Sequence, residues 1–131
     1  MEATKNNTRM TLTLALSYGS REELSEATRK IAVDYKEGKI SLDEINQQSI
    51  SNHLYTKDMP DPELMIRTSG EHRISNFLLW QLAYTELYFT DKFWPEFTRN
   101  DLFKAIYDFQ QRERRFGMTS DQINEQLTIT N

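Results

Sequence analysis

The chain has 131 residues, of which 37% are hydrophobic and 27% are charged, a composition typical of one soluble globular domain. Its formal net charge of −4 argues against a general nucleic-acid surface, so any anion must be held by a local group of cations. The absence of cysteine excludes disulfides and thiolate chemistry, and two histidines make a structural zinc site unexpected. Because no apolar run is long enough to span a bilayer and the N-terminus is polar, we expect a cytoplasmic protein.

The first predicted element is a strand. Residues 1–8 are polar and unpatterned, and we interpret them as a lead-in. Residues 10–17 then alternate between large apolar and small side chains, which is the pattern of a strand with one apolar face. The apolar positions are Met10, Leu12, Leu14 and Leu16.

Two helix starts follow. Ser20 stands three residues before Glu23, as in a capping box, and predicts a helix that ends near Gly38. Ser41 and Glu44 repeat this spacing and predict a shorter helix to about residue 48. The expected buried face of the first helix consists of Leu24, Ala27, Ile31 and Tyr35.

Residues 64–66 form a short apolar run between turn residues, which is typical of a central strand buried on both faces. Residues 77–84 are apolar nearly all round, and Ser75 or Asn76 can cap them as a buried helix. Residues 87–89 predict a third strand.

Trp94 and Pro95 predict a turn, and Thr98 begins a last long helix with a basic end. The expected inner face of that helix is Leu102, Ile106 and Phe109. Strands that alternate with helices predict an α/β fold with a mainly parallel sheet flanked by helices. Because three strands make a thin sheet, we interpret the chain as part of a larger α/β domain.

Residues 67–76 combine several features of an anion site. Arg67 follows a predicted buried strand, at the edge where open α/β sheets bind ligands. Arg67 and Arg73 offer two planar cations suited to phosphate oxygens, and Ser75 offers a hydroxyl at a predicted helix start. Together they predict a diphosphate clamp with Gly70 close to the ligand. An ordinary solvated loop, in which the arginines pair with Glu71, is the alternative.

Glu86 lies between a predicted buried helix and an apolar strand, where a carboxylate needs a cation. Beside a diphosphate it would suit magnesium, and the alternative is a salt bridge to Arg67 or Arg73. For His72 we favour hydrogen bonding in the anion loop over general-base catalysis.

Residues 61–87 read DPELMIRTSGEHRISNFLLWQLAYTEL, and this segment is very similar to the C-terminal signature of the undecaprenyl diphosphate synthase (cis-prenyltransferase) family. The similarity continues through WPEF at 94–97 to RERRFG at 112–117. Upstream, Asn7-Thr8 and TLTLALSYGSR at 11–21 look like the family's Asn-Thr-Gly-Leu-Thr-Leu and Asn-Tyr-Gly-Gly-Arg segments, with Arg9, Ser17 and Ser20 as departures.

The resemblance implies roles for individual residues. Arg67, Arg73 and Ser75 match the positions that hold the diphosphate of isopentenyl diphosphate, and Glu86 matches a carboxylate that helps to position Mg²⁺. Arg115-Phe116-Gly117 matches an Arg-x-Gly motif that reaches into the partner's active site in a homodimer. The alternative for Arg115 is a helix end that Gly117 terminates.

The implied reaction adds isopentenyl diphosphate units to an allylic diphosphate such as farnesyl diphosphate and forms a polyprenyl lipid carrier. The implied location is cytoplasmic, with peripheral contact at the inner membrane face through the lipid product. No Asp-Gly pair occurs, so the family's Asp-Gly-Asn-x-Arg-Trp motif and its catalytic Asp are absent. We therefore interpret residues 1–131, with a polar tail at 118–131, as the C-terminal portion of a single domain and expect it to be inactive alone.

Two other functions remain open: a noncatalytic partner subunit of a prenyltransferase, and a generic phosphate-binding module. The first tends to lose the arginines that this chain keeps, and the second would not need Glu86 or the Arg-x-Gly ending. A set of aromatic residues predicts either a dimer face or core packing. The set is Tyr84, Tyr88, Phe89, Phe93, Trp94 and Phe97.

Overall fold

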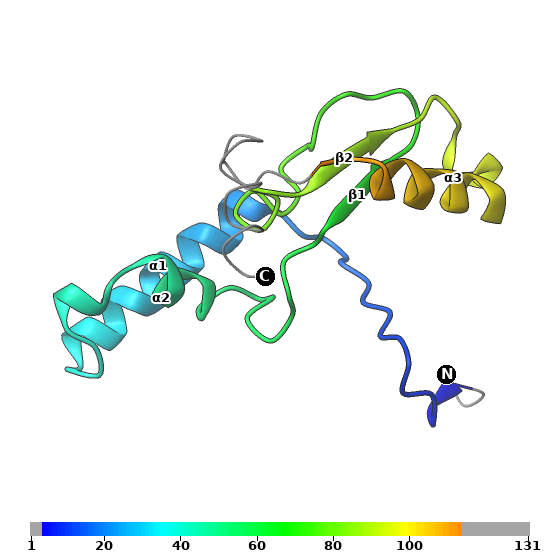
Figure 1. Ribbon diagram of the computed structural model, residues 1–131. Helices are drawn as coiled ribbons and strands as arrows, with labels where there is room; N and C mark the ends of the chain where they lie inside the picture. The colour runs from blue at the N-terminus through cyan, green and yellow to red at the C-terminus, as the bar shows by residue number, and fades with distance from the viewer. Residues whose placement is uncertain (1–3, 114–131) are drawn as a thin grey trace, which may run out of the picture.

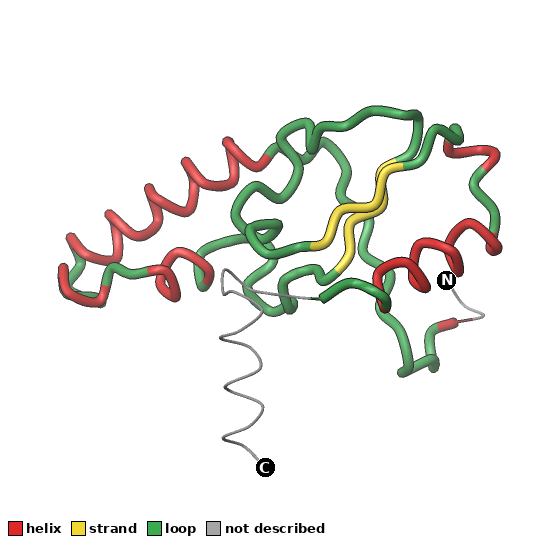
Figure 2. The backbone as a smooth tube through the Cα atoms, turned by 45° about the horizontal axis from the view of Figure 1, so that its top comes forward, coloured by secondary structure: helices red, strands yellow, loops and turns green. Residues whose placement is uncertain are grey.

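The computed structural model describes residues 4–113, which form an α/β arrangement of α-helices, 3₁₀ turns and a small parallel sheet (Figure 1). The elements are α1 Ser20–Lys36, α2 Gln47–Ser51, β1 Leu64–Arg67, β2 Glu86–Phe89 and α3 Arg99–Gln110, with 3₁₀ turns at Leu42–Glu44 and Trp94–Glu96. The α1 and α2 helices lie together at one end, and the strands and α3 lie at the other (Figures 1 and 2). No helix within residues 4–113 has the length and apolar character to cross a bilayer.

The sheet consists of β1 and β2, paired in parallel, so the α/β class with a parallel sheet is confirmed. The register places Leu64 opposite Glu86 at one edge and Arg67 opposite Phe89 at the other. All eight strand residues are half-buried rather than fully buried. The carboxyl ends of both strands therefore meet at the edge that carries Arg67.

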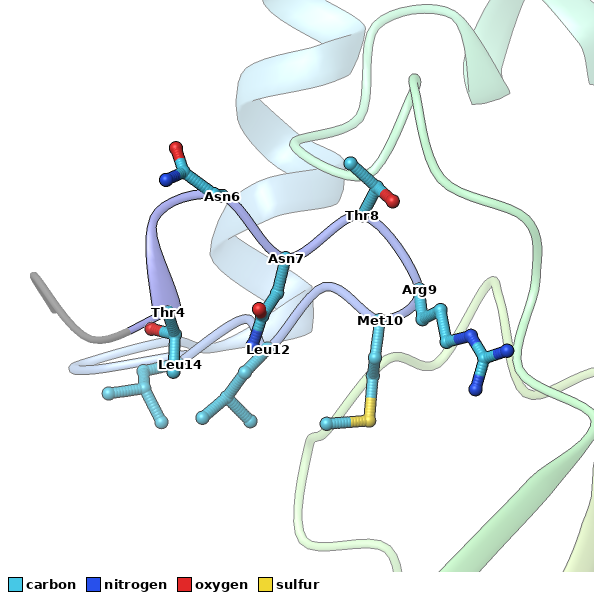
Figure 3. Close-up of a pocket in the computed structure, with 8 residues that line it drawn as sticks. All are labelled: Thr4, Asn6, Asn7, Thr8, Arg9, Met10, Leu12 and Leu14. Atoms are coloured by element: carbon cyan, nitrogen blue, oxygen red, sulfur yellow. The ribbon is translucent and has the colours of Figure 1, made fainter.

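The strand predicted at residues 10–17 is not formed. The segment is extended, but it pairs with neither strand of the described sheet. Its four large apolar side chains are 71–82% exposed, and three of them, Met10, Leu12 and Leu14, point to one side in Figure 3. Alternation fixes which side chains share a face, but a strand also needs a neighbour that satisfies its backbone hydrogen bonds.

The α1 helix begins at Ser20 as predicted, but its capping box is not formed. Gly19 occupies the N-cap position, and Ser20 and Glu23 are buried at 0% and 1% exposure. The Ser20 hydroxyl accepts a hydrogen bond from the backbone N–H of Leu79 at 2.9 Å. These two polar side chains, with Ala27 and Ile31, form the buried face, whereas Tyr35 is half exposed.

Glu23 is the centre of a buried polar cluster. Its carboxylate accepts hydrogen bonds from the Tyr55 backbone N–H at 2.8 Å, the Tyr18 hydroxyl at 2.5 Å and Gln81 Nε2 at 3.3 Å. Gln81 Nε2 also donates to Thr56 Oγ1 at 2.9 Å. Burial, and then the hydrogen bond to Glu23, raise the pKa of Tyr18. The cluster satisfies a carboxylate that would otherwise be costly to bury.

The helix predicted at 41–48 is split into two short elements. Ser41 and Glu44 form the expected capping box, but it opens only the 3₁₀ turn Leu42–Glu44. Asn46 then starts α2, because its Oδ1 accepts from the backbone N–H groups of Gln48 and Ser49 at 2.9 and 3.1 Å. A second strong cap therefore ended the first helix after one turn.

The helix predicted at 77–84 is replaced by a series of turns. Ser75, Asn76 and Leu78 have φ angles of 48°, 60° and 46°, in the left-handed region that a right-handed helix does not use. The expected burial is also limited: Leu82 is buried together with the polar Gln81, whereas Phe77, Leu79 and Tyr84 are 37–65% exposed. The segment is a series of turns that contacts the start of α1.

The last helix is close to its prediction. Thr98 and Asp101 form a capping box at the start of α3, and the turn at Trp94–Glu96 is also present. Of the expected inner face, Leu102 and Ile106 remain more than a third exposed. The fully buried residue of α3 is Ala105. The helix itself is predicted correctly, but its buried face is at Ala105 rather than at Leu102 and Ile106.

We predict that the ion pair between α1 and the residues after α2 makes stability depend on pH. His53 Nε2 lies 2.9 Å from Asp34 Oδ2, and Lys39 Nζ lies 3.1 Å from Asp34 Oδ1. The hydrogen bond to Asp34 raises the pKa of His53 above 6.5, and the same bond lowers the pKa of Asp34 below 3.8. The His53 contribution is therefore complete below pH 6.5 and is lost as pH rises through the raised pKa. The Asp34 contribution is lost only below pH 3.8.

The measurement is thermal unfolding of the whole chain at pH 5.5 and pH 8.0, for the wild type and for His53→Gln. The wild type should lose more stability than the variant between these two values, because the glutamine side chain of the variant cannot titrate. An equal pH dependence of both proteins would contradict the prediction.

Candidate anion-binding site

The candidate site is a cleft of about 310 Å³ at the carboxyl end of β1. It is lined by Met65, Ile66, Arg67, Thr68, Ile74, Ser75 and Phe77. The lining combines one guanidinium and two hydroxyls with an apolar side. Such a cleft suits a ligand with an anionic head and a short apolar part.

Arg67 is held by one edge of its guanidinium. Its Nη1 donates to Ser75 Oγ at 2.9 Å and to the backbone carbonyl of Arg73. Within residues 4–113, the structure gives no carboxylate partner to Arg67 and no hydrogen-bond partner to its Nε and Nη2. The Ser75 hydroxyl accepts from Arg67 and keeps its own proton to donate. The arrangement therefore presents N–H and O–H donors to a phosphate group.

A tight turn at 74–77 places Ser75 beside Arg67. The Phe77 N–H donates to the Ile74 carbonyl at 3.0 Å, and both central residues have positive φ, as in a type I′ turn. The predicted helix start at Ser75 is therefore wrong. The anion would be held by Arg67 and hydroxyl groups, without help from a helix N-terminus.

The loop after β1 is fixed against the loop after β2. The Ser69 N–H donates to the Lys92 carbonyl at 2.8 Å, and the Gly70 N–H donates to the Thr90 carbonyl at 2.9 Å. Gly70 has φ 67°, and a Cβ there would lie 3.1 Å from Asp91 Oδ1. Gly70 therefore lies close to Asp91, whereas the sequence analysis places it close to a ligand. His72 stacks on Phe89 with 4.8 Å between ring centroids.

The Arg73 side chain is not among those that line the cleft. Its Nη1 pairs with Glu71 Oε2, and 63% of its side chain is exposed. For Arg73, the alternative of a solvated ion pair is what the structure shows. Because exposed ion pairs contribute only about 0–1 kcal/mol, Arg73 can exchange Glu71 for a stronger anion at little cost.

Glu86 lies at the opposite end of the sheet from Arg67. The register separates the two positions by three residues along the strands, or about 10 Å. The Glu86 carboxylate pairs with Arg112 Nη1 at 3.0 Å, rather than with Arg67 or Arg73. Glu86 therefore has a cationic partner, as the sequence analysis expects, but this partner is Arg112.

Magnesium does not fit the described residues alone. Glu86 is engaged by Arg112, and no three His, Cys, Asp or Glu side chains in residues 4–113 come together as potential ligands. Mg²⁺ usually binds through one or two carboxylates plus substrate phosphates. A carboxylate from outside these residues, or a rearranged Glu86, would be required.

Arg112 is a site residue that sequence reasoning missed. It contacts Glu86, donates to the Leu87 carbonyl at 2.9 Å, and pairs with Asp108 at 2.5 Å. The hydrogen bond to Glu86 is the main cause of a raised Arg112 pKa. The four-residue spacing of Asp108 and Arg112 was the available signal. Arg115 and Gly117 lie outside the described residues.

The comparisons with known proteins agree on one family. A family profile described as "Putative undecaprenyl diphosphate synthase" matches residues 1–117. The isoprenyl transferase of Geobacter sulfurreducens is 54% identical over 124 residues, which are 95% of this chain and 50% of that protein. The tritrans,polycis-undecaprenyl-diphosphate synthase of Thermoplasma volcanium is 54% identical over 116 residues, covering 88% of this chain and 45% of that protein.

A solved structure also shares the fold of this chain. Lavandulyl diphosphate synthase from Lavandula x intermedia, in complex with dimethylallyl diphosphate, aligns with a TM-score of 0.77 and 45% identity. The alignment covers 79% of this chain and 45% of that one. The chain spans about half the length of the curated relatives it matches. The extent of the family match and the identity to its members show that the chain belongs to the undecaprenyl diphosphate synthase (isoprenyl transferase) family.

Proposed function

We propose that this chain supplies the part of a cis-prenyltransferase that grips isopentenyl diphosphate. The observation that carries the proposal is the contact between Arg67 and Ser75, both of which line the cleft of about 310 Å³. The free edge of Arg67 and the Ser75 hydroxyl would bind the diphosphate. The apolar side, formed by Ile66 and Phe77, would receive the five-carbon group.

In the proposed reaction, the double bond of isopentenyl diphosphate attacks the allylic carbon of a second substrate such as farnesyl diphosphate. A carbon–carbon bond forms, the allylic diphosphate leaves with the bonding electron pair, and a proton is lost to give a new cis double bond. The residues of this chain would bind and orient the nucleophile, which converts a bimolecular encounter into a positioned one. Bound Mg²⁺ would supply positive charge for a leaving diphosphate, and holding it would need a carboxylate from outside residues 4–113 or a Glu86 released from Arg112.

The clamp predicts losses in affinity for isopentenyl diphosphate. Arg67→Ala removes a charge-assisted contact and should weaken binding by roughly 30- to 150-fold, equivalent to about 2–3 kcal/mol. Arg73→Ala should act in the same direction, and Ser75→Ala should cost a smaller factor of about five. Titration calorimetry with the 131-residue chain measures these constants. Arg99→Ala, which removes an exposed arginine of α3, is the matched control. Equal affinity of wild type and Arg67→Ala would show that the cleft is only solvated surface.

We also propose that this chain does not catalyse prenyl transfer by itself. The support is that it lacks an Asp-Gly pair, spans half of its relatives, and exposes an apolar extended segment at Met10–Leu16 that a further strand could cover. Purified chain with labelled isopentenyl diphosphate, farnesyl diphosphate and Mg²⁺ should incorporate no label above background. Turnover that co-purifies with this chain would refute the proposal.

A homodimer that works at the cytoplasmic membrane face is our proposal for the complete protein. Phe93 and Trp94 are 62% and 71% exposed, and exposed aromatic side chains suit an interface. We propose further that Arg115 and Gly117 complete the partner's site.

In an enzyme restored to full length, truncation after Arg112 should lower activity and leave the fold intact, because the Arg112–Glu86 pair remains. Mixing this truncation with an Arg73→Ala enzyme should restore part of the activity, since a mixed dimer contains one complete site. A monomer in sedimentation at micromolar concentration, or no recovery on mixing, would count against the dimer.

A noncatalytic partner subunit is the second candidate. The exposed apolar face of residues 10–16 favours it, because such a face is suited to docking onto another polypeptide. Calorimetry with isopentenyl diphosphate separates the two functions, since a purely structural subunit needs no affinity for that substrate.

A further inference from the structure

The turn that carries Ser75 is attached to the first turn of α1. Asn76 Oδ1 accepts a hydrogen bond from the Arg21 N–H at 3.0 Å, and the Asn76 carbonyl accepts from the Ser20 N–H at 2.9 Å. These N–H groups belong to the start of α1, where a helix leaves its first donors without internal partners. Asn76 therefore caps a helix that begins more than fifty residues earlier in the sequence.

This attachment is tight. A Cβ on Gly19, the N-cap residue of α1, would lie 3.1 Å from Asn76 Nδ2. The Leu79 N–H adds a third hydrogen bond from the same segment, to Ser20 Oγ at 2.9 Å. Ser20 at the helix start is fully buried, so water cannot easily replace the two hydrogen bonds that Ser20 makes to this segment, whereas the Arg21–Asn76 hydrogen bond is exposed.

The turn needs such support because its own backbone is unfavourable. Ser75 and Asn76 both have positive φ, although neither is glycine. Asparagine tolerates this region better than serine does. One backbone hydrogen bond, from the Phe77 N–H to the Ile74 carbonyl, closes the turn. Contacts outside the turn must therefore fix its conformation.

We propose that Asn76 is a positioning residue that uses the N-terminus of α1 to hold Ser75 Oγ against Arg67. This inference rests on the proposed function, because it concerns the same diphosphate clamp. Asn76 itself touches no ligand in this arrangement. It raises the fraction of molecules in which the turn is formed, and a clamp formed in fewer molecules binds proportionally more weakly.

The test compares two asparagine caps. Asn76→Gly keeps a backbone that accepts positive φ but removes the Oδ1 acceptor. Asn46→Gly removes the equivalent acceptor at α2, which lies outside the residues lining the cleft. Arg67→Ala reports on the clamp directly. The probe is inorganic pyrophosphate, titrated calorimetrically into the 131-residue chain at fixed ionic strength, with far-UV circular dichroism as the check of folding.

We expect Asn76→Gly to weaken pyrophosphate binding by about three- to tenfold, the factor that corresponds to a typical lost helix cap. Asn46→Gly should bind like the wild type. Unchanged affinity in Asn76→Gly, or an equal loss in Asn46→Gly, overturns the inference. If Arg67→Ala still loses binding in that case, the proposed clamp survives. If the wild type does not bind pyrophosphate, clamp and inference both fail.

Amide hydrogen exchange gives a second readout that needs no ligand. Asn76→Gly should lose protection at the Arg21 and Phe77 amides, whereas Asn76→Asp keeps an acceptor oxygen and should restore it. If Asn76→Gly unfolds, the exchange of Asn76→Asp against the wild type still tests whether the cap orders the turn. Equal loss of Phe77 protection in Asn76→Asp would show that the cap does not order the turn.

Discussion

The first turn of α1 is the point on which the rest of the described structure depends. Glu23 carries a charge into a position that is 1% exposed, and a buried carboxylate must find donors or leave the interior. Its donors come from Tyr18, Tyr55 and Gln81, three residues in three different segments. One carboxylate therefore ties the lead into α1, the chain after α2 and the turns before β2 to the same place.

Hydrogen bonds between distant segments are important here because the apolar interior is small. The buried hydrophobic residues among those described are Ala27, Ile31, Leu54, Leu82 and Ala105. Two of these are alanines, which contribute little apolar area. The large apolar side chains of residues 10–16 remain in solvent. Hydrogen bonds to α1, rather than dense packing, therefore fix the turn-rich segment that leads from the anion site to β2.

The two ends of the small sheet are stabilised differently, and this separates the predicted site residues. At the carboxyl edge, Arg67 is held by a hydroxyl and a carbonyl, so its charge is not neutralised by a carboxylate within residues 4–113. At the other edge, Glu86 is neutralised by Arg112, which follows α3. An unneutralised cation suits an incoming anion, whereas a neutralised carboxylate is a poorer magnesium ligand.

The sequence by itself determined the family, the α/β class, the two paired strands to within one residue (64–66 and 87–89 predicted, Leu64–Arg67 and Glu86–Phe89 observed), and the helix starts near Ser20 and Thr98. These follow from local periodicity, capping spacing and a long ordered motif, all of which are carried by neighbouring residues. Only the tertiary structure decided which partner each polar side chain takes. Ser20 and Glu23 have the spacing of a capping box, yet both bond to distant segments. Asn76 caps α1, whereas the helix at 77–84 that it was expected to open is not formed. The sequence likewise left the partner of Glu86 open. In the structure Arg67 lies at the opposite end of the sheet, and Arg112 pairs with Glu86. A local pattern shows that a polar group needs a partner, but only the path of the chain shows which one comes within hydrogen-bonding distance.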